Sequence, residues 1–287
     1  MPRSGFQLIR PIELSTSVVF ASPHSGRDYT WSFMRRSALS ELAIRSSEDA
    51  FVDQLIDHAP TFGAPLLTAN VPRAYVDLNR SSEELDSALI EGVAKSGHNP
   101  RVASGLGVIP RVVSNGRAIY RGKISLAEAR KRLLDYWHPY HGQLASLLQE
   151  ASQTFGQGIL VDFHSMPREA LDGVARNSQT RPDVVLGDRF GASASNLIVD
   201  QIEAAFVNAG FIVSRNTPFA GAYITQTYGR PSRNQHAVQV EIDRSIYMNE
   251  RDLTPNESFD CVKRSLQSVL ADVCNIGRLD RLPLAAE

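Results

Sequence analysis

The chain has 287 residues, of which 43% are hydrophobic and 21% charged, with a formal net charge of −1 at pH 7. This composition predicts a packed core, excludes global disorder and gives no support for binding nucleic acid. Residues 1–16 lack the apolar core of a signal peptide, and no run of 18 apolar residues is present. We therefore expect a cytoplasmic protein without a membrane segment. Cys261 and Cys274 lie 13 residues apart on one predicted helix, too far for a disulfide, and we expect two buried thiols.

Short β-rich runs alternate with longer helical patterns, and no repeat or linker marks a domain boundary. We therefore expect one domain over residues 1–287. Runs such as SVVFAS and ILVDF are almost continuously apolar, as is typical of strands covered on both faces. The predicted strands are 17–22, 65–71, 158–164, 183–187, 211–215, 222–227 and 237–242.

The predicted helices span 50–58, 125–151, 193–208 and 258–274. Ser125 and Glu128 form a capping box at the start of the longest one, and Pro139 is predicted to kink or interrupt it. Strands separated by helices predict an α/β protein with a mixed, mostly parallel sheet and helices on both faces. Residues 81–119 are rich in Ser, Gly, Asn and Pro, and such an irregular segment is a candidate cover for a site.

Two histidines end predicted strands, His24 in ASPHSG and His164 in VDFHSMP. Ligands bind beyond the carboxyl ends of strands in α/β sheets, so this pair favours a shared site. Zinc hydrolases take three ligands from His, Asp and Glu and leave one position for water. The segment RSSEDAFVDQL offers Glu48, Asp49 and Asp53 as carboxylates, although a helix start also favours acidic residues through its dipole.

A metal-activated water also needs a general base, and Glu241 ends an alternating strand in AVQVEIDRS. Arginine forks suit the recognition of carboxylates, and local clusters in a chain of balanced charge indicate a small anionic ligand. The motifs of serine hydrolases (G-x-S-x-G), P-loop proteins and HExxH metalloproteases are absent. The candidate substrate-binding residues are Arg73, Asn79 and Arg80 in NVPRAYVDLNR, with Tyr228 and Arg230 in QTYGRPSRNQ, a segment that also carries Arg233.

With these motifs together, the chain resembles the N-formylglutamate amidohydrolase family. The matching segments are PHSG, SEDAFVDQL, RAYVDLNR, VDFHSMP, GDRFGASAS, TPFAGAYITQTYGRP and VQVEIDRSIYMNE, in order over about residues 18–250. The resemblance implies a three-layer α/β/α sandwich similar to zinc carboxypeptidases. It also implies one Zn²⁺ per chain and hydrolysis of an N-formyl or other short N-acyl amide of an acidic amino acid, above all N-formyl-L-glutamate to formate and L-glutamate.

Carried onto this sequence, the resemblance makes His24 and His164 metal ligands. It favours Asp49 as the third ligand and leaves Glu48 as the alternative. The chain departs from the related carboxypeptidases, which take a histidine and a glutamate from one HxxE motif. Here the third position after His24 is Arg27, so the carboxylate must come from elsewhere in the chain.

The resemblance also makes Glu241 the general base, while Asn79 and Arg80 hold the substrate carboxylate or polarise the scissile carbonyl. The implied partner is a small anionic N-acyl amino acid, not a nucleic acid or a membrane. One alternative is a zinc deacylase or carboxypeptidase-like hydrolase of the same fold that acts on another N-acyl amino acid or a peptide. Another is a metal-free protein that binds small anions.

Overall fold

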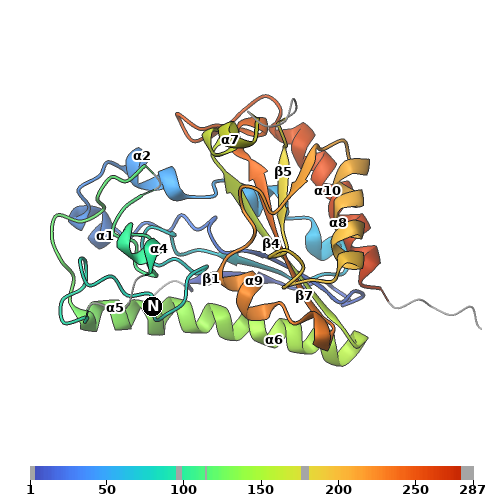
Figure 1. Ribbon diagram of the computed structural model, residues 1–287, viewed down its shortest axis with the longest axis horizontal. Helices are drawn as coiled ribbons and strands as arrows, with labels where there is room; N and C mark the ends of the chain where they lie inside the picture. Colours follow the sequence, from blue (N-terminus) through green and yellow to red (C-terminus); the bar gives the residue numbers. More distant parts are fainter. Residues whose placement is uncertain (1–3, 95–98, 114, 176–180, 279–287) are drawn as a thin grey trace, which may run out of the picture.

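The computed structural model describes residues 4–94, 99–113, 115–175 and 181–278. Its centre is a seven-stranded sheet in the order β1-β3-β2-β4-β7-β5-β6 (Figure 1). A small separate hairpin pairs β8 (Met248–Asn249) with β9 (Thr254–Pro255). The strands of the large sheet are β1 (Phe6–Ile9), β2 (Val18–Ser22), β3 (Leu66–Ala69), β4 (Gly158–Met166), β5 (Val184–Gly187), β6 (Val213–Arg215) and β7 (Gln235–Asp243).

The middle of this sheet is parallel. Strands β3, β2, β4 and β7 run in one direction, whereas β1 is antiparallel to β3 and β5 is antiparallel to β7. The expected mixed, mostly parallel sheet is therefore confirmed. Because parallel strands end at the same edge, the residues that follow β2, β4 and β7 meet there. The register of β4 on β7 places His164 opposite Glu241 at this edge.

Helices cover both faces of the sheet and complete the expected three layers. Alternate residues of each central strand enter different cores: Val19 and Leu160 pack with α6 on one face, and Phe20 and Val161 pack with α8 and α10 on the other. Figure 1 shows α6 along one side of the sheet and α8 beside α10 on the other. The helices are α1 (Trp31–Arg36), α2 (Glu41–Ile44), α3 (Val52–Leu55), α4 (Pro100–Ala103), α5 (Leu126–Arg132), α6 (His138–Phe155), α7 (Asp172–Ala175), α8 (Asn196–Asn208), α9 (Tyr223–Tyr228) and α10 (Phe259–Ile276).

The long predicted helix forms as α5 and α6, joined by a π-helical segment over Leu133–Trp137. The interruption lies directly before Pro139, which occupies the first turn of α6. Proline has no backbone N–H, and its ring clashes with the carbonyl four residues earlier. The predicted interruption is therefore confirmed. The Ser125 side chain accepts a hydrogen bond from the Glu128 N–H at the start of α5, as the capping box predicted.

Four local predictions are wrong. The predicted strand over 222–227 falls in helix α9 (Tyr223–Tyr228). Strand β1 pairs with β3, although no strand was predicted over Phe6–Ile9. The predicted helix over 50–58 is reduced to the single turn α3, because Phe51 before it is left-handed with φ of 66° and Ile56 after it leaves the helical region with φ of −111°. Both cysteines are free, but Cys261 is exposed and only Cys274 is buried.

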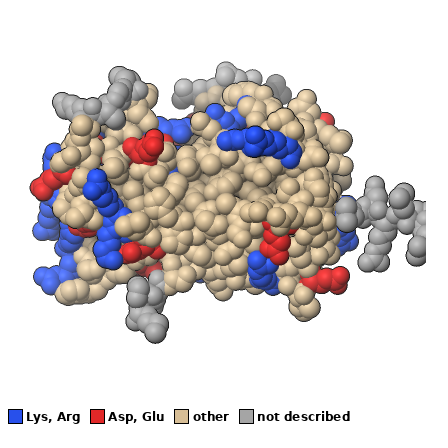
Figure 2. Space-filling model, turned by 90° about the horizontal axis from the view of Figure 1, so that it is seen from below, with Lys and Arg blue, Asp and Glu red and all other residues tan. Residues whose placement is uncertain are grey.

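The surface over α6 carries charges of both signs near its edges, and its middle is uncharged (Figure 2). Within the described residues, no helix combines the length and the apolar character needed to cross a bilayer. The segment 81–119 is largely irregular, as expected, apart from α4. Residues 95–98 and 114 of that segment lie outside the described residues.

Candidate active site

A polar cavity of about 440 Å³ opens at the edge where the parallel strands end. His24 follows β2, His164 lies in β4, and Glu241 lies in β7. Asp49 comes from the turn before α3, and the loop after β3 supplies Arg73, Asn79 and Arg80. The sheet therefore gathers into one cavity residues that are more than 200 positions apart in the chain.

Three side-chain atoms converge in this cavity. His164 Nδ1 lies 3.1 Å from His24 Nδ1 and 3.0 Å from Asp49 Oδ2, and His24 Nδ1 lies 3.5 Å from the same Asp49 oxygen. All three residues are buried, and together they form a group able to hold a metal ion. Two ligands that each lie 2.0–2.1 Å from a tetrahedral zinc ion are about 3.3 Å apart, which matches these separations.

A second carboxylate orients each histidine ring from behind. His24 Nε2 donates to Asp77 Oδ1 at 2.7 Å, and His164 Nε2 donates to Asp162 Oδ2 at 2.9 Å. An ionised carboxylate only accepts hydrogen bonds, so the neutral form of each ring carries its proton on Nε2. The lone pairs of both Nδ1 atoms are then directed at the point where these two atoms and Asp49 Oδ2 converge. Histidines that ligate metals are commonly held in this way.

The structure distinguishes Asp49 from Glu48. The Asp49 N–H donates to the His24 carbonyl, and Asp49 Oδ1 accepts from Arg244 Nη2 at 3.0 Å. Its Oδ2 is thereby turned to the histidines. Glu48 instead accepts from Arg45 through both of its oxygens, and it does not line the cavity.

The electrostatic environment of the three residues favours a cation. Burial acts to raise the pKa of Asp49, but hydrogen bonds and charges from His164 and His24 hold it well below its usual range. Burial acts to lower the pKa of His164, yet Asp162 and Asp49 raise it well above its ordinary value. The carboxylates thus stabilise added positive charge at this point, and the His₂Asp set fits a metal ion of the catalytic zinc type.

Glu241 is the remaining buried carboxyl group of the cavity. It faces His164 across the β4–β7 register, and its Oε1 accepts from Gln239 Nε2 at 2.8 Å. Burial raises the pKa of Glu241 to about 7. A carboxyl group with a pKa near neutrality is suited to take up and release a proton during turnover.

The three polar residues predicted in NVPRAYVDLNR all line the cavity. Arg73 Nε donates to Asp77 Oδ2 at 3.0 Å, and the Arg80 guanidinium donates to the carbonyls of Leu106 and Asn79. The Asn79 side chain is engaged internally. Its Oδ1 accepts from the Ile224 N–H, and its Nδ2 donates to Gln239.

The structure does not bring Tyr228 and Arg230 into this cavity. The Tyr228 ring stacks on His141, and its hydroxyl hydrogen-bonds that residue, so its polar atom is turned into the core beside α6. Arg230 is exposed and donates to the carbonyls of Gln226 and Gly229. For Tyr228 the difference follows from α9, because this residue lies in a helix over Tyr223–Tyr228 and not in the predicted strand.

Five residues that the structure places in or around the site were not predicted from the sequence. Asp162 and Gln239 each precede a predicted site residue by two positions in a strand, so strand alternation was a signal that could have identified them. The other three are held by turns and carried no comparable signal. These are Asp77, Arg101 and Arg244.

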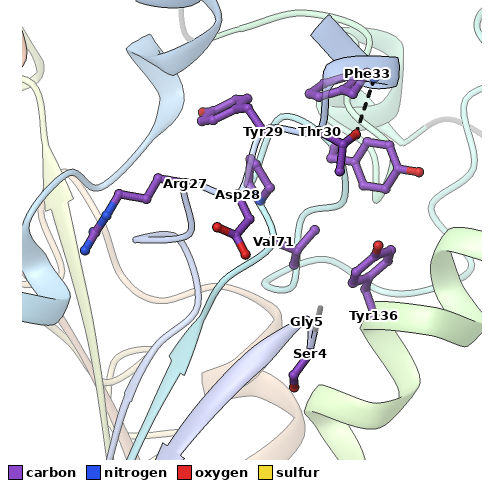
Figure 3. Close-up of a pocket in the computed structure, with 11 residues that line it drawn as sticks. Ser4, Gly5, Arg27, Asp28, Tyr29, Thr30, Phe33, Val71 and Tyr136 are labelled. Atoms are coloured by element: carbon purple, nitrogen blue, oxygen red, sulfur yellow. Dashed lines mark hydrogen bonds between the residues drawn. The ribbon is translucent and has the colours of Figure 1, made fainter. Parts of the chain in front are cut away.

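A second cavity lies on the other side of the loop that carries His24. It has a volume of about 460 Å³, and its lining includes the aromatic side chains of Tyr29, Phe33 and Tyr136. In Figure 3, Asp28 points toward the cavity and Arg27 points away from it. Arg27 pairs with Asp53, and neither of these two residues lines the cavity that contains His24 and His164. None of the three converging residues, nor Glu241, lines this second cavity.

Comparisons with known proteins identify the family. Residues 16–248 match the family model described as N-formylglutamate amidohydrolase. An N-formylglutamate deformylase of Pseudomonas aeruginosa is 31% identical over 82% of this chain and 83% of its own length. The corresponding protein of Pseudomonas putida is 30% identical over 81% of this chain and 82% of its own.

Solved structures agree with this assignment. The crystal structure of an N-formylglutamate amidohydrolase from Ralstonia eutropha is 32% identical, with a TM-score of 0.89 over 96% of this chain and 98% of the other. A protein from Agrobacterium tumefaciens, at 14% identity and a TM-score of 0.63 over 96% and 95%, shares the fold. The chain belongs to the N-formylglutamate amidohydrolase family and is a hydrolase that acts on an amide bond.

Proposed function

We propose that this chain is a zinc-dependent amidohydrolase that converts N-formyl-L-glutamate and water to formate and L-glutamate. The observation that carries the proposal is the convergence of His24 Nδ1, Asp49 Oδ2 and His164 Nδ1 in the same cavity as Glu241. Three protein ligands and a nearby carboxyl group are the requirements of metal-assisted amide hydrolysis. The names of the relatives supply the substrate.

His24, Asp49 and His164 would hold one zinc ion per chain. When bound, such an ion acts as a Lewis acid that polarises a carbonyl group and lowers the pKa of water. Glu241 takes the proton from the attacking water and delivers it to the leaving nitrogen as the C–N bond breaks. Gln239 holds the Glu241 carboxyl group through its amide N–H, so the base is fixed in orientation.

The cationic groups of the cavity suit the two carboxylates of N-formylglutamate. Arg73, held by Asp77 beside the ligand histidines, is assigned to the α-carboxylate, which lies next to the scissile amide. Of the two roles expected for Arg80, we favour binding of the substrate carboxylate over polarisation of the carbonyl. We assign Asn79 a positioning role, because its amide already bonds to Gln239 and to the backbone of α9.

The decisive experiment combines metal analysis with a turnover panel. The purified protein, before and after incubation with zinc, is measured for metal content and for hydrolysis of N-formyl-, N-acetyl- and N-succinyl-glutamate. We expect one zinc per chain and the fastest turnover with the formyl compound. A protein that neither contains nor gains stoichiometric zinc would be a metal-free anion-binding protein. Faster turnover of another acyl group would favour the alternative deacylase.

A further inference from the structure

The four arginines that line the cavity differ in their ion pairing. Arg73 pairs with Asp77, and Arg244 pairs with Asp49, both at 3.0 Å. Arg80 and Arg101 line the same cavity, and no carboxylate of the described residues forms an ion pair with either. Among the described residues, neither positive charge is therefore held in a direct ion pair, at a site where an anionic ligand is expected.

Arg80 is held rigidly and carries its charge in a buried position. Its Nε donates to the Leu106 carbonyl at 3.1 Å and its Nη1 to the Asn79 carbonyl at 2.9 Å, and the side chain is only 8% exposed. Burial lowers the pKa of Arg80, Asp77 acts to raise it, and the nearby charges of Arg73 and Arg101 lower it further. An anion that binds here would relieve this repulsion.

A single turn holds both unpaired arginines in place. Arg101 lies in α4, where its own N–H donates to the Asn99 side chain and its carbonyl accepts from the Leu106 N–H. The Leu106 carbonyl is in turn the acceptor for Arg80 Nε. Arg101 itself is exposed and lines the cavity, and its charge acts on that of the buried Arg80.

We propose that Arg101, together with Arg80, binds the side-chain carboxylate of the substrate and thereby selects dianionic over monoanionic N-acyl amino acids. The inference rests on the proposed function and adds a specificity residue from the irregular segment 81–119. Guanidinium groups only donate hydrogen bonds, and they match the two oxygens of a carboxylate. A side-chain amide carries no charge and offers one acceptor oxygen in place of two, with its NH₂ group facing these donors, so it would bind more weakly.

The kinetic test compares N-formyl-L-glutamate with its neutral isostere N-formyl-L-glutamine. For Arg101→Gln we expect kcat/KM for the glutamate compound to fall roughly 10- to 100-fold, with a smaller loss for Arg101→Lys. The value for the glutamine compound should stay within about twofold, because that substrate gains little from the charge. Arg233→Gln, which removes an exposed arginine outside the cavity, is the matched control. An equal loss on both substrates, or no loss on either, would overturn the proposal.

A binding measurement separates this proposal from the proposed function. Calorimetry with glutarate, a dianion, and butyrate, a monoanion of similar length, needs no turnover. We expect the wild-type protein to bind glutarate more tightly and Arg101→Gln to lose that preference. If the wild-type protein fails to hydrolyse N-formylglutamate but shows this Arg101-dependent preference, only the proposed function fails. If it hydrolyses the substrate and Arg101→Gln changes neither preference nor binding, only the role of Arg101 is refuted.

Discussion

Asp162 illustrates, at the scale of one residue, how a buried charge outside the cavity lining controls the site. It is fully buried in β4 and accepts from His164 Nε2. Asp162→Asn keeps an oxygen acceptor but removes the charge that supports the ring as a ligand. We expect zinc affinity to fall about 10- to 100-fold, measured by competition with a chelator. Asp200→Asn, at an exposed ion pair with Arg215, should leave the affinity unchanged, and an equal effect of both substitutions would contradict the assignment.

Glu241 allows proton transfer to be separated from metal binding. Glu241→Gln preserves the size of the side chain but cannot accept a proton. We expect zinc content to remain at the wild-type level while kcat falls roughly 10²- to 10⁴-fold, the range for loss of a general base. The control is Glu150→Gln, which alters an exposed ion pair between Glu150 of α6 and Arg10. If Glu241→Gln retained full turnover, or lost zinc together with activity, Glu241 would not be the base.

At the scale of elements, the loop after β2 must pass close to the end of β3. A Cβ atom added at Gly26 would lie 2.1 Å from the Val71 carbonyl oxygen, and a backbone atom cannot move aside cheaply. We expect Gly26→Ala to lower the free energy of unfolding by about 2 kcal/mol and to reduce zinc content, because the loop carries His24. Gly142→Ala in α6, where the added atom meets nothing within 4 Å, should instead stabilise by about 0.5–1 kcal/mol. Denaturant unfolding measures both, and equal effects would refute the steric argument.

The helices and strands that were predicted correctly are those whose own residue pattern is enough to favour one secondary structure. The buried strands β2, β4 and β7 are apolar or regularly alternating, and such patterns persist in any tertiary context. Residues 222–227 contain β-branched and aromatic side chains that favour a strand, but here the Ile224 N–H bonds Asn79 Oδ1 and the segment packs as helix α9. Tertiary contacts override local preference at such a position.

The same distinction explains which parts of the site were predictable. His24, His164 and Glu241 lie at the ends of recognisable strands, so sequence places them at one edge. Asp77 comes from an irregular turn and Arg101 from the four-residue helix α4, and the position of both segments depends on what they pack against. The turn that carries Arg101 is fixed by its bond to Leu106 and not by any periodic pattern. Sequence reasoning therefore identified residues that converge in the cavity, but not Asp77, which accepts a hydrogen bond from His24, or Arg101, which also lines the cavity.

At the scale of the whole molecule, His141 links three parts of the chain. From α6, its Nε2 donates to the Leu78 carbonyl, next to the loop that lines the cavity, and its Nδ1 accepts from the Tyr228 hydroxyl of α9. A neutral ring with its proton on Nε2 satisfies both contacts. Burial lowers the pKa of His141 to about 4, so the folded protein keeps this ring neutral well into the acidic range.

This link makes the stability of the fold dependent on pH. An unfolded histidine titrates near pH 6.5, so below that value the unfolded state binds a proton that the folded state excludes. Stability from His141 is therefore complete above about pH 7 and is lost as pH falls toward 4, by about 2 kcal/mol at pH 5. His141→Gln keeps one donor and one acceptor but cannot titrate, so its free energy of unfolding should fall less between pH 7 and pH 5. Urea unfolding of both proteins at these two pH values measures the difference, and parallel losses would show that His141 does not couple folding to pH.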